Sequence, residues 1–281
     1  MNIELHGSKN TALPLIAATL LEKNIYYIYN IHLLDDIKIQ LDILKQFNIN
    51  IQIYKDKFII DTRDVIFPRE IKYNKNTRAT YYFIGSTIHD NNLIYEIGNG
   101  CELDKNNRKI DYHLELIKLS GKKFSLTNNL LEICGNIIDR KIEYTFRCPS
   151  VGATINGLLM FSKFNSEITL KNYAKDPYVF DIISFLKLMG KYIFIYDDKI
   201  ILKNNNLNKN NKIIKFYINN DPIEILTYTI FSAINLKSNE ISTYKIGPIK
   251  IKNLGESLNL LNDIGIELIS IKNKYYLIKK K

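Results

Sequence analysis

The sequence predicts an α/β protein built from repeated copies of one helix–strand unit. Two observations carry this prediction. Helix-like and strand-like apolar patterns alternate along the whole chain, and the same pair of local signatures recurs at a nearly constant interval. With 281 residues and 46% hydrophobic residues, the chain is long enough for a substantial core, in one large or two modest domains.

The first signature is a helix-like apolar run that ends in a small residue and is followed by a strand-like run. The last residue of each run is Asn or Gly, at positions 48, 121, 190 and 265, a spacing of about 70 residues. Both residue types suit the left-handed conformation that ends many helices. The segments that follow, such as 49–53 and 266–271, are rich in β-branched residues and predict strands.

The second signature lies earlier in each repeat. Helix-like runs of small and apolar residues begin near Thr11, Arg78, Gly152 and Ile223. Strand-like runs follow them, clearest at 25–29 and 167–170. Each unit is therefore predicted as helix, strand, helix and a strand pair. The pair is clearest at 192–196 and 199–202, which two aspartates separate as in a β-hairpin.

Four such units account for nearly the whole chain. The segment from Asn204 to Asn211 is almost entirely Asn and Lys and predicts a linker between the third and fourth units. The predicted organisation is a three-unit domain over 1–203, a linker over 204–211, and a single unit of a partial second domain over 212–281.

Composition excludes several classes of protein. No apolar run of 18 residues occurs, so no membrane span is expected. The first ten residues lack a signal peptide's apolar run, which predicts an unexported, cytoplasmic protein. Three cysteines and four histidines show no metal-ligand spacing, so neither a metal nor a disulfide framework is expected. Phosphate-loop, dinucleotide-binding and hydrolase-elbow motifs are also missing, and no cofactor is expected.

The formal net charge of +10 has two interpretations. A basic protein can bind nucleic acid or another polyanion. Alternatively, the charge reflects a general bias of the sequence toward Lys, Asn and Ile. The lysines are scattered rather than clustered, so we favour the bias and expect no nucleic-acid partner. Local sites for small anions are compatible with either interpretation.

Two basic residues stand at predicted helix starts. Lys9 lies in the segment 7–10 before the first helix, where free backbone amides and an ammonium group could bind phosphate. Arg78 opens a later helix and could bind an anion through two parallel hydrogen bonds. For both residues, an ordinary solvated surface charge is the alternative.

Two further segments could carry chemistry. Cys101 follows a Gly-rich loop and is flanked by Lys105, Arg108 and Lys109, and positive surroundings favour a reactive thiolate. The alternative is an inert small residue. The segment 150–154 opens the third unit's helix and offers amides and the Ser150 hydroxyl to a ligand, or simply caps that helix.

Five motifs in this order resemble one known family. Residues 7–14, GSKNTALP, resemble its SGAKNAALP start, and Arg78-Ala79-Thr80 resembles its RAS helix. The segment 98–113 resembles GGCxxGxRPxDxH, 150–154 equals SVGAT, and 172–177 resembles NAAREPE. The chain thus resembles UDP-N-acetylglucosamine enolpyruvyl transferase (UDP-N-acetylglucosamine 1-carboxyvinyltransferase), of the EPSP synthase-like superfamily. The loop cysteine separates it from the shikimate-pathway sister family.

The resemblance implies a fold, the inverse α/β prism. In the family, six βαβαββ units form two domains of three, with the substrates between them. This chain would hold about four of the six units and would be shortened at its C-terminal end. Self-association or a companion chain could then supply the missing units.

The resemblance also implies an activity. The family transfers enolpyruvate from phosphoenolpyruvate to the 3′-hydroxyl of UDP-N-acetylglucosamine and releases phosphate, the first committed step of peptidoglycan synthesis. Carried over, Cys101 would be the general acid and the site of a covalent adduct, and Lys9, Arg78 and Arg108 would bind phosphoenolpyruvate. The implied nucleotide-sugar residues are Asn10, Asp111, Tyr112, Ser150, Val151 and Gly152.

Two departures from the family pattern favour an alternative function. Cys148 stands where the family has a lysine, and the segment that supplies the family's general base has no counterpart before Lys281. The alternative is a truncated, catalytically impaired homologue that binds the nucleotide sugar or needs a second chain.

Overall fold

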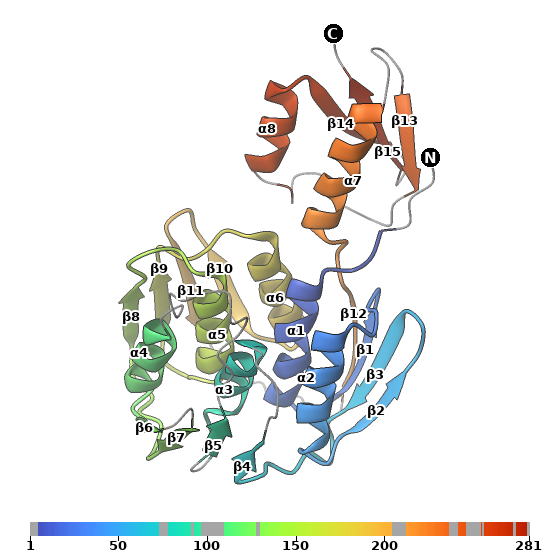
Figure 1. Ribbon diagram of the computed structural model, residues 1–281. Coiled ribbons are helices and arrows are strands. Elements are labelled where there is room, and N and C mark those ends of the chain that lie inside the picture. The colour runs from blue at the N-terminus through green and yellow to red at the C-terminus, as the bar shows by residue number, and fades with distance from the viewer. Residues whose placement is uncertain are drawn as a thin grey trace.

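The computed structural model describes residues 5–72, 78–90, 93–96, 110–127, 130–203, 212–235, 241–245, 254, 256–271 and 274–279. Within them the chain forms two bodies with separate hydrophobic cores. The larger body contains three copies of the repeat and the smaller contains one (Figure 1).

The three units of the larger body share one order of elements, as predicted. Unit one consists of α1 (Lys9–Ala18), β1 (Ile25–Tyr29), α2 (Asp35–Lys45), β2 (Asn50–Ile53) and β3 (Lys57–Asp61). Unit two consists of the short 3-10 helix η2 (Arg78–Thr80), α3 (Tyr81–Thr87), β5 (Leu93–Glu96), α4 (Asp111–Leu119), β6 (Lys123–Thr127) and β7 (Leu130–Cys134). Unit three consists of α5 (Val151–Phe161), β9 (Ile168–Lys171), α6 (Pro177–Leu188), β10 (Tyr192–Ile195) and β11 (Lys199–Lys203).

The predicted helix ends are confirmed. Asn48, Gly121, Gly190 and Gly265 have φ angles of 56°, 93°, 90° and 78°, all in the left-handed region. Such a residue reverses the chain direction after a helix at little steric cost when it is Gly or Asn. The second helix of every unit therefore turns back directly into the hairpin that follows it.

Each sheet of the larger body has a fourth strand, which the local sequence patterns did not predict and which the family's βαβαββ unit implied. These joining strands, β4 (Glu70–Ile71), β8 (Ile142–Thr145) and β12 (Ile213–Tyr217), pair in parallel with β5, β9 and β1. The sheet orders are β12-β1-β3-β2, β4-β5-β7-β6 and β10-β11-β9-β8. Because β12 follows unit three but joins the sheet of unit one, it links the last and first units of the larger body.

The helices lie inside and the sheets outside. Every residue of α1 from Thr11 to Ala18 is buried, and so is every residue of α5 from Ala153 to Phe161. Strands β1 and β3 instead alternate buried and half-buried residues, so that only one face of their sheet is fully covered. Figure 1 shows the helices packed between the surrounding sheets. This arrangement is an inverse α/β prism, as the family resemblance implied.

The smaller body is one further unit. It consists of α7 (Pro222–Asn235), β13 (Ile241–Lys245), α8 (Glu256–Asp263), β14 (Ile266–Ile271) and β15 (Lys274–Lys279), with sheet order β13-β15-β14. Its core contains Leu5 from the start of the chain, together with Ile225, Ala233, Leu254, Leu261, Ile266 and Leu268.

Two segments therefore differ from the predicted domain limits. Residues 213–217 belong to the larger body because they pair with β1, and Leu5 belongs to the smaller body because it packs in its core. Both exchanges involve contacts between residues far apart in the sequence, which local patterns do not encode. The predicted linker, 204–211, lies outside the described residues.

The two bodies are joined by two antiparallel segments, at 6–8 and 218–221. The amide of Ser8 donates to the Asn219 carbonyl at 3.0 Å, and the amide of Asp221 donates to the His6 carbonyl at 2.9 Å. The Asn30 side chain donates to the Asn220 side-chain oxygen at 2.8 Å. This pair of segments, the crossover, is therefore hydrogen-bonded to the loop after β1 through Asn30.

In the described part of the chain, no helix has the length and hydropathy of a membrane span.

Candidate functional site

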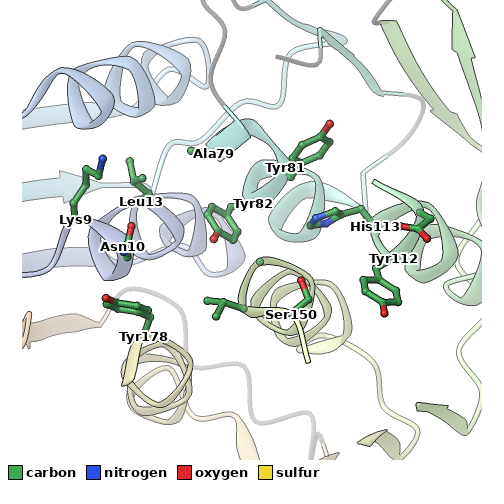
Figure 2. Close-up of a pocket in the computed structure, with 13 residues that line it drawn as sticks. Lys9, Asn10, Leu13, Ala79, Tyr81, Tyr82, Tyr112, His113, Ser150 and Tyr178 are labelled. Carbon is green, nitrogen blue, oxygen red and sulfur yellow. The ribbon is translucent and has the colours of Figure 1, made fainter. Parts of the chain in front are cut away.

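The candidate site is a pocket at the end of the larger body where its helices begin. Residues at the starts of α1, α3, α4, α5 and α6 line it, and its cavity volume is about 880 Å³ (Figure 2). A helix start carries unpaired backbone amides and a partial positive charge. The first turns of α1, α3 and α5 contain no acidic residue that would offset this charge. The pocket is therefore suited to anionic groups.

Seven of the ten predicted site residues line this single pocket. They come from the starts of three different helices: Lys9, Asn10, Asp111, Tyr112, Ser150, Val151 and Gly152. Cys101 and Arg108 lie outside the described residues, as does the side chain of Arg78. The backbone of Arg78 opens η2, next to the pocket residue Ala79.

Lys9 is the first residue of α1 and reaches toward the start of α2. Its ammonium group donates to the Asp36 carboxylate at 2.7 Å, and its side chain is 42% exposed. An exposed pair of this kind contributes little to stability. Lys9 is thus oriented at the pocket but remains accessible to an anionic ligand.

Asn10 follows Lys9 and contacts α6 across the pocket. Its side chain hydrogen-bonds the hydroxyl of Tyr178, and burial raises the pKa of that hydroxyl. The Tyr178 hydroxyl therefore stays protonated and can donate a hydrogen bond, but it is a poor base. In Figure 2 both side chains border the same space.

Asp111 and Tyr112 are the first two residues of α4, and both contact Arg147, which does not line the pocket. The Arg147 guanidinium lies 2.5 Å from the Asp111 carboxylate and 3.0 Å from that of Glu115. It also covers the Tyr112 ring at 4.9 Å from the ring centroid. The Tyr112 hydroxyl accepts a hydrogen bond from the Cys148 amide at 2.8 Å. The loop before α5 thus fixes the start of α4.

Ser150 and Gly152 form the start of α5. The Ser150 hydroxyl caps the helix by accepting from the Ala153 amide at 3.4 Å. Gly152 leaves space beside the pocket, because a Cβ atom there would lie 3.9 Å from the Tyr82 hydroxyl. Of the two roles that the sequence allowed for Ser150, capping the helix and binding a ligand, the structure shows the cap. Val151 and Gly152, which follow it, line the pocket.

The far wall of the pocket is aromatic. Tyr81 stacks on His113 with ring centroids 4.8 Å apart and an interplanar angle of 14°. The His113 ring nitrogen Nδ1 lies 2.9 Å from the side-chain amide of Asn156 on α5. These contacts tie α3, α4 and α5 together directly below the pocket.

Sequence reasoning missed several pocket residues, chiefly Leu13, Tyr81, Tyr82 and Tyr178. Leu13 lies inside the recognised segment 7–14, and each of the three tyrosines lies one or two residues beyond a recognised motif. Counting one helical turn on from each helix start would have found them, because residues on the first turn share the same end of the helix.

The side chains and helix starts that line the pocket suit anionic groups. Among the residues that the structure describes, no group of three or more His, Cys, Asp or Glu side chains could hold a metal ion. The pocket can bind phosphate or carboxylate groups through Lys9 and the helix starts, and a larger polar ligand along α4 and α5.

The inverse prism and its pocket of helix starts define the class of protein to which enolpyruvyl transferases belong. The chain itself belongs to the family EPSP synthase (3-phosphoshikimate 1-carboxyvinyltransferase), which it matches over residues 1–279.

Curated relatives carry a narrower name. The chain is 30% identical over 194 residues to UDP-N-acetylglucosamine 1-carboxyvinyltransferase 2 of Caldanaerobacter subterraneus, covering 68% of this chain and 46% of the relative. It is 26% identical over 280 residues to UDP-N-acetylglucosamine 1-carboxyvinyltransferase of Rickettsia africae, covering 97% of this chain and 64% of the relative. The chain thus spans less than two thirds of the length of these relatives.

Solved structures share the fold. The enolpyruvyl transferase NikO from Streptomyces tendae matches 99% of this chain with a TM-score of 0.79 at 14% identity, and the match covers 65% of NikO. EPSP synthase from Acinetobacter baumannii matches all of this chain with a TM-score of 0.75 at 13% identity, again over 65% of its own length.

Proposed function

We propose that this protein transfers the enolpyruvyl group of phosphoenolpyruvate to the 3′-hydroxyl of UDP-N-acetylglucosamine and releases phosphate. The observation that carries the proposal is the gathering of seven predicted site residues, from three separate segments, in one pocket. The relatives named as UDP-N-acetylglucosamine 1-carboxyvinyltransferases support the choice of acceptor.

The proposed reaction is an addition followed by an elimination. In the addition, a proton from Cys101 reaches the methylene carbon of phosphoenolpyruvate, and the sugar 3′-oxygen bonds to the adjacent carbon as it loses its own proton. In the elimination, a proton leaves the new methyl group and phosphate departs, which restores the double bond. Lys9 and the helix starts would stabilise the charge on the phosphate and carboxylate. Arg78 and Arg108 would act with them.

At the other end of the pocket, the proposal assigns the nucleotide sugar to α4 and α5. Asn10 would bind the sugar. Asp111, Tyr112 and the amides of residues 150–152 would bind the uridine and diphosphate. A negatively charged diphosphate fits the start of α5, whose first turn contains no acidic residue.

Phosphate release tests the proposal. Purified protein is given phosphoenolpyruvate and UDP-N-acetylglucosamine, and Cys101→Ala and Lys9→Met proteins are treated in the same way. We expect phosphate release that needs both substrates and falls at least a hundredfold in each variant, the loss typical of a missing acid or charge-stabilising group. Release that Cys101→Ala leaves unchanged would overturn the assigned role of the cysteine.

The alternative is a protein that binds the nucleotide sugar without turnover, or that needs a second chain. The match to the Rickettsia africae relative covers 64% of that protein. Calorimetric titration with UDP-N-acetylglucosamine separates the two. Binding without phosphate release supports the alternative, and turnover by the isolated chain excludes it.

Two wider statements belong to the same proposal. The reaction would be the first committed step of peptidoglycan synthesis, and it would take place in the cytoplasm with soluble substrates. The place in peptidoglycan synthesis follows from the proposed substrates and is tested with them.

A further inference from the structure

Arg147 lies outside the pocket but contacts two residues that line it. It belongs to the loop between β8 and α5, and its side chain crosses to the first turn of α4. There its guanidinium meets the carboxylates of Asp111 at 2.5 Å and Glu115 at 3.0 Å. Asp111 and Glu115 are four residues apart and therefore share one face of α4.

The same guanidinium also restrains an aromatic ring. It lies over the Tyr112 ring at 4.9 Å from the centroid, within the range of a cation–π contact. The hydroxyl of Tyr112 is held by the backbone, because the Cys148 amide donates a hydrogen bond to it at 2.8 Å. The ring also meets buried Phe146 edge-on at 5.7 Å. Tyr112 is thus held at its face, its edge and its hydroxyl by three consecutive residues, 146–148.

These contacts have an electrostatic consequence. Asp111 and Glu115 place two carboxylates on the first two turns of α4, beside a pocket suited to anions. Without a nearby cation they would repel a negatively charged ligand. Arg147 neutralises part of this charge without occupying the pocket.

We propose that Arg147 is a positioning residue for nucleotide-sugar recognition, which sets the orientation of Asp111 and Tyr112 and offsets the acidic charge beside them. The inference rests on the proposed function, because it takes UDP-N-acetylglucosamine as the ligand. It requires arginine rather than any cation. Only a planar guanidinium can bridge two carboxylates and cover a ring at the same time.

Three variants test the proposal: Arg147→Met, Arg147→Lys and the control Arg140→Met. Arg140 is an exposed arginine in the loop before β8. UDP-N-acetylglucosamine is titrated into each protein by calorimetry, and the melting temperature is measured in parallel. We expect about tenfold weaker binding for Arg147→Met, the combined effect of one cation–π contact and exposed ion pairs. Arg147→Lys should recover only a small part of this loss, and Arg140→Met should bind as the unaltered protein does.

Steady-state kinetics give a second measurement, which distinguishes a positioning role of Arg147 from a role in stability alone. The KM for the nucleotide sugar should rise by the same factor in Arg147→Met, with kcat changed by less than about twofold, as for a lost ground-state contact. Unchanged affinity in Arg147→Met, or a fall in melting temperature with unchanged affinity, would overturn the positioning role. Full recovery by lysine would overturn the need for a guanidinium. If the unaltered protein binds no nucleotide sugar, the proposed function fails and this role fails with it, an outcome distinct from a loss confined to Arg147.

Discussion

Gly152 shows how one missing side chain shapes the pocket. It lies in the first turn of α5, and a Cβ atom added there would be 3.9 Å from its nearest neighbour, the Tyr82 hydroxyl. The fold itself could therefore accept alanine at this position. A ligand that lies along the start of α5 would not fit beside alanine, because the added methyl group would take space next to the backbone amides.

Gly152→Ala should thus separate binding from stability. We expect the free energy of unfolding to stay constant or rise by up to about 1 kcal/mol, because alanine is the better helix former. Affinity for UDP-N-acetylglucosamine should fall about tenfold, through the loss of close backbone contact. Thermal unfolding and calorimetry measure the two quantities. Equal affinity in the variant would show that the ligand does not approach α5 at this point.

Elements differ in how far the sequence determines them. The helix ends at Asn48, Gly121, Gly190 and Gly265 were predictable, because a left-handed residue is a local requirement. Local patterns did not predict the joining strands β4, β8 and β12, because a parallel strand pairs with residues distant in the sequence. Only the family's βαβαββ unit implied them. The starts of the site helices were found through motifs. Tyr178 lies one residue beyond the recognised segment 172–177, but that it borders the same pocket as Asn10 follows only from the packing of α6 beside α1.

The crossover depends on a glycine. A Cβ atom at position 7 would lie 1.8 Å from the Asn30 carbonyl oxygen, a backbone atom that cannot move aside cheaply. Gly7→Ala should therefore destabilise the protein by about 2 kcal/mol, in the range of overpacked sites. The check is denaturant unfolding beside Gly152→Ala, the alanine substitution that the fold should accept. A stability equal to that of Gly152→Ala would contradict the close packing at the crossover.

The opposite end of the larger body, where α3 and α5 end, contains a partly buried histidine. The His89 ring nitrogen Nε2 lies 3.0 Å from the Met160 carbonyl. Burial lowers the pKa of His89 to about 4, and the nearby charges of Lys163, Lys122 and Lys191 act in the same direction. The neutral ring is the form that the folded protein accommodates.

This predicts a pH dependence of stability. The folded-state pKa lies below the unfolded value of about 6.5, so the contribution of His89 is fully present above pH 6.5 and is lost as pH falls toward 4. The loss should reach the order of 2–3 kcal/mol. Unfolding measured at pH 7.5 and 5.0 should therefore show a smaller decrease in His89→Gln than in the unaltered protein. Asp90, Asp181 and Asp221, whose pKa values burial raises, oppose the trend in both proteins and cancel in this comparison.

At the scale of the whole molecule, the two bodies differ in how their inner helices are covered. In the larger body, α1 is buried from Thr11 to Ala18 by the helices around it. Helix α7 follows β12 as α5 follows β8, yet much of its surface faces water. Ile230, Phe231 and Ile234 are 44%, 52% and 74% exposed, and Ile264 after α8 is 66% exposed. The smaller body holds one unit where the larger holds three.

Such an apolar face favours association in water. We expect the 281-residue chain to self-associate in a concentration-dependent way, and Ile234→Lys with Phe231→Gln to shift it toward the monomer. Sedimentation velocity measures this. The control is the melting temperature, which should change little because both side chains are exposed. A chain that is monomeric at all concentrations, with and without the substitutions, would contradict the expectation.

The most direct test of the central claim is detection of the product. The protein is incubated with phosphoenolpyruvate and UDP-N-acetylglucosamine, and the nucleotide sugar is analysed by mass spectrometry. The proposed function predicts a nucleotide sugar heavier by one enolpyruvyl group, formed with an equal amount of phosphate and absent with Cys101→Ala. An unchanged nucleotide sugar, at a protein concentration where calorimetry shows the pocket filled, would contradict catalysis by this chain.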